Sequence, residues 1–297
     1  MFRERGRRGR RVRLVLTVAL TGGIGSGKSS AARILEDCGA GVLSLDDIAR
    51  SVLGPGRQAV AEVAGLWPGV VRDGTVDRRA LADVVFADPV ALERLNGIVH
   101  PPTWREARRR LAGLEAAGCE AAVVELALLA GSGREDAFHG NVVVEAPFGL
   151  RIDRLERHRG MSREAAAARM ASQRDPLPLA DLVVDNGGSP GELERRVRDA
   201  WRDWLRPYAS NLLRGERTRG DDRRPSRHEL GRAVARLNHW GVGARRRGDG
   251  IVAPAPVDRE AVLRAGFVPA AEGPAAFVSA NPACRIELST VRDGAMG

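Results

Sequence analysis

Residues 14–29 read LVLTVALTGGIGSGKS, a short apolar run followed directly by a glycine-rich loop. The apolar run predicts a strand buried on both faces, because it is continuous and rich in valine and leucine. The loop matches the pattern G-x-x-x-x-G-K-[ST] from Gly22 to Ser29. A strand, this loop and a following helix together predict a phosphate-binding loop in an α/β fold.

The chemistry of the loop explains the residue types at this spacing. Glycines allow successive backbone N–H groups to turn inward around phosphate oxygens. Lys28 is the only lysine in the chain, and it is expected to bridge the β- and γ-phosphates of a bound nucleotide, while the Ser29 hydroxyl binds Mg²⁺. The residues predicted to bind the nucleotide are Gly23, Ile24, Gly25, Ser26, Gly27, Lys28, Ser29 and Ser30.

The length and composition of the chain exclude several classes of protein. A chain of 297 residues with 43% hydrophobic residues can bury a core of one large domain or two modest ones. No apolar run approaches the roughly 18 residues of a membrane-spanning helix, so no membrane partner is expected. The three cysteines are far apart and form no CxxC or Cys/His cluster, which argues against disulfide frameworks and structural zinc. A cytoplasmic protein is predicted.

The net charge of +9 comes almost entirely from arginine, since 46 of the 47 basic residues are of this type. The excess is concentrated in a basic N-terminal extension, residues 1–13, and between Arg206 and Arg247. Charge runs are usually solvated surfaces, so we do not expect a nucleic-acid partner. The sequence leaves the oligomeric state open.

After residue 13, short apolar runs alternate with helical stretches, which is typical of a parallel α/β sheet. The expected strands are residues 14–20, 41–45, 121–126, 141–146 and 181–184. Two longer segments are expected to be helical additions to this core, an insertion at about 50–118 and an arginine-rich lid at about 149–175. A last helix is expected at about 192–213.

The end of the chain has a different composition. Residues 215–228 are polar and predict a linker. The remaining residues, 229–297, predict a small appendage with a helix near 229–238 and possible strands near 276–278 and 285–288.

Asp46 follows the second predicted strand, at the edge where open α/β sheets bind their ligands. A carboxylate there can orient an acceptor hydroxyl and take its proton, or help to hold Mg²⁺. The alternative is that Asp46 only caps the next helix, and the residues alone do not decide between the two. A GTPase with an N-K-x-D guanine-reading loop is excluded, because the chain has no second lysine.

Several further motifs resemble those of the dephospho-coenzyme A kinase family, over residues of about 14–213. They are LTGGIGSGKSS at the phosphate loop, LDDIAR at 45–50, DGTVDRRALADVVFAD at 73–88, LNGIVHPP at 95–102, RHRGMSREAAAARMASQ at 157–173 and ADLVVDNGG at 180–188. Taken together, these motifs resemble those of the family in their order and spacing along the chain.

The resemblance implies a P-loop kinase fold: three α/β/α layers, a five-stranded parallel sheet, a helical acceptor-binding insertion and a lid. It implies transfer of the ATP γ-phosphate to the ribose 3′-hydroxyl of dephospho-coenzyme A, with Mg²⁺. Lys28, Asp46 and Arg154 would be catalytic, and Ser29 and Asp46 would hold the metal ion. Arg157 and Asn186 would contact the nucleotide, with Asn186 near the adenine, and Asp46, Arg50, Arg78 and His100 would contact the acceptor.

The chain departs from the family pattern on the acceptor side. Ser44 stands where the family usually has an aspartate, and residues 127–131 read ALLAG where it has P-L-L-[FV]-E. Glu125 lies nearby at the end of a strand and is a candidate to replace the lost glutamate. Residues 261–288 resemble the closing part of a GrpB-like domain, which predicts a degenerate or truncated appendage.

Two other functions are compatible with the residues themselves. One is a different P-loop kinase that acts on a nucleoside or nucleotide. The other is a non-catalytic basic protein that binds a nucleotide or a nucleic acid through its arginine-rich ends, in which case its affinity would fall steeply with salt.

Overall fold

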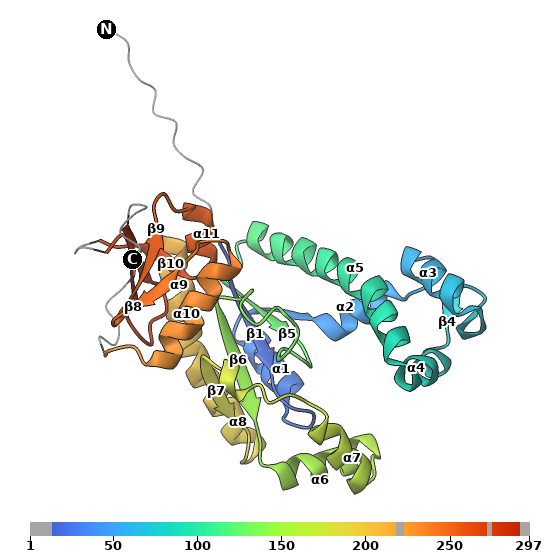
Figure 1. The fold of residues 1–297 in the computed structure, drawn as a ribbon. Helices are drawn as coiled ribbons and strands as arrows, with labels where there is room; N and C mark the ends of the chain where they lie inside the picture. The colour runs from blue at the N-terminus through green and yellow to red at the C-terminus, as the bar shows by residue number, and fades with distance from the viewer. Residues whose placement is uncertain (1–13, 218–222, 272–274, 292–297) are drawn as a thin grey trace. The chain divides into compact units, whose positions relative to one another are not determined.

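The computed structural model describes residues 14–217, 223–271 and 275–291 (Figure 1). The expected N-terminal extension, residues 1–13, lies outside these ranges. The described residues divide into two compact units. One holds residues 17–133 and 140–198, and the other holds residues 14–16, the segment Arg134–His139 and the described residues from Asp199 onward. The second unit thus begins before residue 215, where the sequence predicts a linker.

The first unit is built on a parallel five-stranded sheet in the order β2-β5-β1-β6-β7. Its strands are β1 (Leu16–Thr21), β2 (Gly41–Ser44), β5 (Ala121–Glu125), β6 (Gly140–Glu145) and β7 (Leu182–Asp185). All five lie within two residues of the predicted runs, and the predicted fold class is confirmed. The strands form because their side chains are buried on both faces, as in β5, where Ala121 to Val124 are fully buried.

The helices α1 (Lys28–Asp37) and α8 (Pro190–Ala200) flank this sheet. The insertion after β2 forms a helical subdomain. The insertion contains α2 (Leu45–Val52), α3 (Gln58–Leu66), a 3₁₀ turn η1 (Pro68–Val70), α4 (Arg78–Ala87) and α5 (Pro89–Ala116). A core of its own, which includes Val60, Val63, Leu81 and Val85, holds these helices together. The predicted helical insertion is therefore a packed subdomain.

Two features of the insertion differ from the expectation of helices joined by turns. A two-stranded hairpin, β3 (Val71–Arg72) with β4 (Thr75–Val76), turns at Asp73 and Gly74, both of which have positive φ. The pair Pro101–Pro102 does not end α5, although each proline removes an amide donor. Packing against α2, α3 and α4 holds α5 together as one helix.

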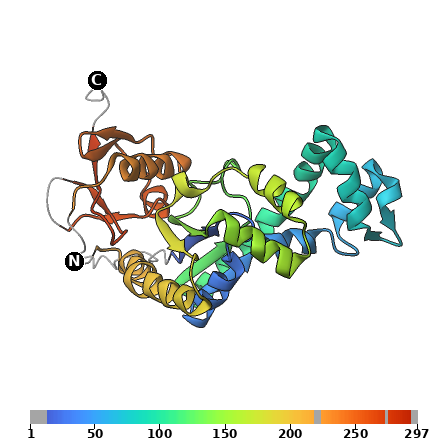
Figure 2. The same ribbon diagram turned by 90° about the horizontal axis from the view of Figure 1, so that it is seen from below.

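The lid contains α6 (Phe148–Arg159) and α7 (Arg163–Ala171), which lie beside one another (Figure 2). Gly160, in the left-handed conformation, ends α6, and the Ser162 side chain caps α7. A 3₁₀ turn, η2 (Leu177–Leu179), leads into β7.

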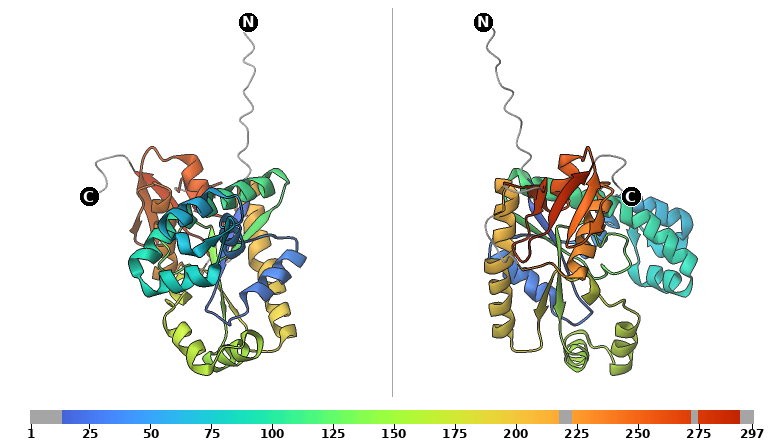
Figure 3. Two further views of the ribbon diagram at one scale, coloured as in Figure 1. Left: turned by 90° about the vertical axis from the view of Figure 1, so that its right-hand side faces the viewer. Right: turned by 60° about the vertical axis from the view of Figure 1, so that its left-hand side comes forward.

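The second unit contains a five-stranded sheet in the order β10-β11-β12-β9-β8 (Figure 3). Its strands are β8 (Arg245–Arg247), β9 (Gly250–Pro254), β10 (Phe267–Pro269), β11 (Phe277–Ser279) and β12 (Glu287–Val291). The helical parts are a π turn η3 (Trp201–Leu205), α9 (Arg206–Arg214), α10 (Arg227–His239) and α11 (Arg259–Arg264). A buried core that includes Leu237, Ile251, Val262 and Leu288 makes the appendage a folded body.

The segment 134–139 belongs to this second unit although it precedes β6 in the chain. Arg232 of α10, with a side chain 9% exposed, pairs with Asp136 and donates to the Glu135 carbonyl at 2.9 Å. The Tyr208 hydroxyl of α9 donates to the His139 carbonyl at 3.0 Å. The second unit is thus built from residues on both sides of β6. Within the described ranges, no helix has the length and apolar character needed to cross a membrane.

Candidate active site

The glycine-rich loop connects β1 to α1, as its sequence predicts. Gly27 immediately precedes α1 and has φ of 97°, a left-handed conformation that favours glycine. A Cβ atom at Gly27 would lie 2.2 Å from Asn186 Nδ2, so a side chain is also excluded by a close neighbour. The helix starts at Lys28, and the positive end of its dipole therefore faces the loop.

Lys28 lies over the loop that precedes it. Its Nζ donates to the carbonyl oxygens of Gly22 at 2.8 Å and Gly23 at 3.2 Å. Burial lowers the pKa of Lys28, while the negative charges of Glu125 and Asp46 oppose this shift. The charges of the Glu125 and Asp46 carboxylates therefore act on the Lys28 ammonium group.

Glu125 and Ser29 join two neighbouring elements of the site. The Ser29 Oγ donates to Glu125 Oε1 at 2.7 Å, which links the first turn of α1 to the end of β5. Glu125 pairs in register with Ser44 at the end of β2. The carboxyl ends of β1, β5 and β2 thus bring the phosphate loop, Glu125 and the start of α2 to one edge of the sheet.

Asp46 is exposed in the first turn of α2. The cap of this helix is Ser44, whose side chain accepts a hydrogen bond from the Asp47 amide at 3.2 Å. The alternative that Asp46 acts as the N-cap is therefore wrong, and its carboxylate remains available for other contacts. Ser44, a departure from the family pattern, acts as this cap.

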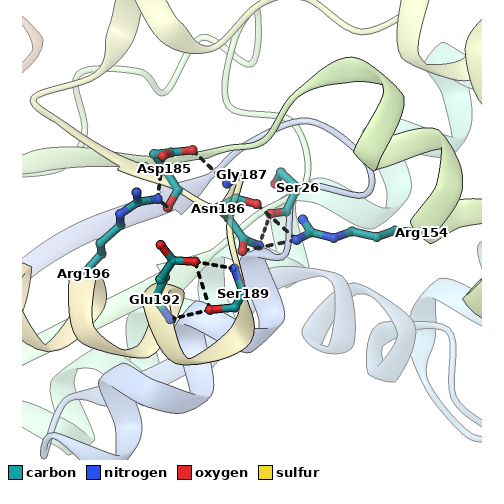
Figure 4. A network of polar contacts seen from close by, with 8 residues as sticks. All are labelled: Ser26, Arg154, Asp185, Asn186, Gly187, Ser189, Glu192 and Arg196. Carbon is teal, nitrogen blue, oxygen red and sulfur yellow. Dashed lines mark hydrogen bonds and ion pairs between the residues drawn. The ribbon is translucent and has the colours of Figure 1, made fainter.

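Asn186 lies beside Ser26 of the phosphate loop (Figure 4). It is 4% exposed, and its Nδ2 donates to the Ser26 carbonyl at 2.7 Å. Arg154 Nη2 donates to the carbonyl oxygen of Asn186 at 3.1 Å and to its Oδ1 at 3.3 Å. Asn186 thus connects the loop to a lid arginine, a contact that its predicted place near the adenine does not include.

The residues on either side of Asn186 are held by a second set of polar contacts (Figure 4). Arg196 Nη1 donates to the Asp185 carbonyl at 2.7 Å, and Asp185 Oδ1 accepts from the Gly187 amide at 2.8 Å. Glu192 Oε2 accepts from the Ser189 amide at 2.7 Å. The turn from β7 into α8 is therefore fixed, and with it the position of Asn186.

Three arginines of the lid helix α6 have different surroundings. Burial lowers the pKa of Arg154, as does the neighbouring charge of Arg157. Arg157 is exposed, and its Nε donates to the Asp153 carbonyl within α6 at 3.2 Å. Arg151 was not among the predicted site residues, yet its Nε donates to the Ile24 carbonyl at 2.9 Å.

Gln173 is a second contact that the sequence did not predict, since its Oε1 accepts from the Ile24 amide at 2.8 Å. The only signal for Gln173 in the sequence is its place at the end of the lid motif.

The predicted acceptor residues lie in the helical insertion. Arg50 is exposed and pairs with Asp47, and Arg78 Nη2 approaches the Arg50 carbonyl at 3.4 Å. His100 is exposed on α5, and no described contact joins it to the two arginines. A separate open cavity of about 550 Å³ lies between α2, α3 and α5, and its lining includes Arg57, Arg105 and Pro101 rather than the three predicted residues.

The altered segment 127–131 ends at Gly131, which has φ of 82°. A Cβ atom there would lie 2.5 Å from Arg174 Nη1, so the guanidinium group takes the space of any side chain. The family's glutamate cannot be accommodated at this position unless Arg174 moves. Leu128, in the same segment, is 59% exposed.

Comparison with known proteins identifies relatives over the first two thirds of the chain. Residues 16–192 match the family model described as dephospho-CoA kinase. The dephospho-CoA kinase of Frankia casuarinae is 42% identical over 196 residues, which cover 64% of this chain and 84% of that protein. The dephospho-CoA kinase of Mycobacterium tuberculosis is 40% identical over 215 residues, which cover 70% of this chain but 52% of that longer protein.

A solved structure has a similar fold. The crystal structure of TT1252 from Thermus thermophilus has a TM-score of 0.57 and 35% sequence identity to this chain. The similarity covers 64% of this chain and 97% of that protein.

Proposed function

The chain belongs to the dephospho-CoA kinase family, and on this premise we propose that it transfers the γ-phosphate of ATP to the ribose 3′-hydroxyl of dephospho-coenzyme A. The products are coenzyme A and ADP, the last step of coenzyme A synthesis. The observation that carries the proposal is the grouping of Lys28, Ser29, Glu125 and Asp46 at one edge of the sheet. Phosphoryl transfer needs this combination of a phosphate-binding cation and carboxylates beside it.

The loop residues 23–30 surround the triphosphate and bind it through the backbone N–H groups that are not already bonded within the protein, as that of Ile24 is to Gln173. Lys28 Nζ contacts the β- and γ-phosphates. This requires Nζ to exchange its hydrogen bonds with the Gly22 and Gly23 carbonyls for phosphate oxygens. The negative charges of Glu125 and Asp46 favour the ammonium form that the phosphates need.

Asp46 orients the 3′-hydroxyl of the acceptor and accepts its proton. As the acceptor oxygen attacks the γ-phosphorus, the bond from phosphorus to the β–γ bridging oxygen breaks and ADP leaves with the electron pair. This role is supported by the exposed position of Asp46, whose carboxylate is not used to cap α2.

Mg²⁺ fits the oxygen donors beside the loop. The Ser29 hydroxyl and the Glu125 carboxylate are already hydrogen-bonded to one another, and Asp46 is the other carboxylate near Lys28. Among the described residues no three His, Cys, Asp or Glu side chains form a metal site. Mg²⁺ would neutralise charge on the phosphate oxygens. We assign Ser29 as a ligand of Mg²⁺, and the Glu125 and Asp46 carboxylates supply negative charge beside the ion.

The lid residue Arg154 stabilises the charge of the transferred phosphoryl group, and Arg157 binds the nucleotide from the same helix. Asn186 contributes by orienting Arg154, with which it shares two hydrogen bonds. Arg50, Arg78 and His100 contact the anionic acceptor from the insertion. We place the reaction in the cytoplasm, which suits the free thiols of Cys38, Cys119 and Cys284.

The proposal is tested by following label from γ-³²P-ATP into dephospho-coenzyme A. The full chain should give labelled coenzyme A, and a 3′-specific nucleotidase should release all of its label. Lys28→Ala should be at least about 10²-fold slower, because it removes the cation that meets the phosphates. Label that stays in ATP, appears only as inorganic phosphate, or enters another position of the acceptor would contradict the proposal.

A further inference from the structure

The side chain of Ile24, at the tip of the phosphate loop, is part of the hydrophobic core of the lid. This core consists of Ile24, Ile152, Leu155, Ala166 and Met170. Ile24 is 9% exposed, and the other four residues come from α6 and α7. The small lid core therefore includes one residue that the nucleotide-binding loop supplies.

The backbone of Ile24 is bound to the lid as well. Its N–H donates to Gln173 Oε1 at 2.8 Å, and its carbonyl accepts from Arg151 Nε at 2.9 Å. Arg151 lies on α6, and Gln173 lies just after α7. The lid thus provides partners for both the N–H and the carbonyl group of Ile24, one on α6 and one just after α7.

Arg151 also covers the preceding loop residue. A Cβ atom at Gly23 would lie 2.0 Å from Arg151 Nη2 and 2.5 Å from Cζ. Only glycine leaves room for the guanidinium group at this distance, so the loop and α6 are matched in shape as well as in hydrogen bonding. Burial of the guanidinium lowers the pKa of Arg151, which agrees with a site partly removed from water.

We propose that Gln173 and Arg151 are positioning residues, which hold Ile24 so that the lid and the phosphate loop behave as one body. ATP affinity then depends on Gln173 and Arg151, although the direct partner of both side chains is the backbone of the loop. The inference rests on the proposed ATP site but not on the identity of the acceptor.

The coupling has a reciprocal consequence. If lid contacts favour the loop conformation that binds phosphate, bound ATP must favour the folded lid by the same factor. The turn after Arg159, between α6 and α7, is exposed and offers a trypsin site with which to measure lid opening. ATP should therefore slow cleavage after Arg159.

The experiment measures the ATP dissociation constant by calorimetry on the full chain, with the rate of cleavage after Arg159 as a second readout. Gln173→Met keeps the volume of the side chain but removes the acceptor for the Ile24 amide. Arg151→Lys keeps the charge but cannot reproduce the guanidinium contacts. Ser172→Ala and Arg169→Ala are matched controls, since both side chains are exposed at the end of α7.

Both test variants should bind ATP about fivefold more weakly, which is the effect of one lost hydrogen bond. ATP should also slow trypsin cleavage after Arg159 less in these variants than in the parent. The controls should bind ATP as the parent does. Unchanged ATP affinity and protection in Gln173→Met and Arg151→Lys would overturn this inference and leave the proposed reaction intact. Failure of the parent chain itself to bind ATP would overturn both.

Discussion

Ser29 Oγ donates a hydrogen bond to Glu125 Oε1 at 2.7 Å, joining the first turn of α1 to the end of β5. The motif supplies the serine, and the neighbouring strand in the sheet supplies the carboxylate. Glu125 also acts on Lys28 through its negative charge. One carboxylate outside the motif thus binds Ser29 directly and acts on the preceding residue, Lys28, through its charge.

Glu125→Gln should raise the Mg²⁺ concentration required for half-maximal transfer by about tenfold, because it removes the negative charge beside the Ser29 ligand. Mg²⁺ titration of the initial rate at saturating ATP measures this. Glu120→Gln is the matched control, since Glu120 is exposed just before the opposite end of β5. An unchanged Mg²⁺ requirement in Glu125→Gln would contradict the assigned role.

Asp46→Asn should lower kcat by about 10²–10⁴-fold, because the amide cannot accept the proton of the acceptor hydroxyl. Its ATP affinity should fall much less than kcat, since Asp46 acts directly on the hydroxyl and only through its charge on Lys28 and Mg²⁺. Asp83→Asn, an exposed carboxylate on α4, serves as the control. Equal losses in kcat and in ATP affinity would remove Asp46 from the role of base.

Arg232→Ala should lower the free energy of unfolding by about 3 kcal/mol, because it removes the buried guanidinium group that pairs with Asp136 and donates to the Glu135 carbonyl. Urea denaturation followed by circular dichroism measures the change. Arg227→Ala, on the exposed first turn of the same helix, should have little effect. Equal stability of the two variants would show that the buried pair does not hold the segment 134–139.

The pH dependence of stability should contain a contribution from Glu229. A hydrogen bond from Arg223 holds the pKa of Glu229 at about 2, below its ordinary value of 4.5. The stabilisation is therefore fully present above about pH 4.5 and is lost as the pH falls toward 2. Glu229→Gln should lose less stability than the parent across this range in urea titrations at each pH. Parallel curves for the two proteins would contradict this.

The parallel sheet and the phosphate loop could be predicted from sequence because their signals are local. The centres of buried strands such as β5 and β6 are short apolar runs rich in valine. The loop motif fixes its own place between β1 and α1. The hairpin β3–β4 was not predicted, although Asp73-Gly74 is a turn signal that could have found it.

The appendage was harder to predict because its sheet joins strands that are distant in sequence. β9 pairs in parallel with β12 and antiparallel with β8, and β10 is only three residues long. Short strands in a mixed sheet carry little periodicity of their own. The resemblance of this part to a GrpB-like domain stays a prediction.

The site itself could be predicted only in part. Lys28 and Ser29 follow from the motif, whereas the contacts of Asn186, Arg151 and Gln173 depend on how α6, α7 and the β7–α8 turn pack around the loop. No spacing rule in one sequence contains that information. The same holds for Arg174, which takes the space beside Gly131.

The most direct test of the account is ADP release by the full chain with ATP, Mg²⁺ and one acceptor at a time. Dephospho-coenzyme A should support turnover, while adenosine, AMP and other nucleosides should not exceed the Lys28→Ala blank. That result would also establish that the ALLAG segment at 127–131 is compatible with catalysis. Turnover with a nucleoside or nucleotide and none with dephospho-coenzyme A would contradict the proposed transfer to dephospho-coenzyme A.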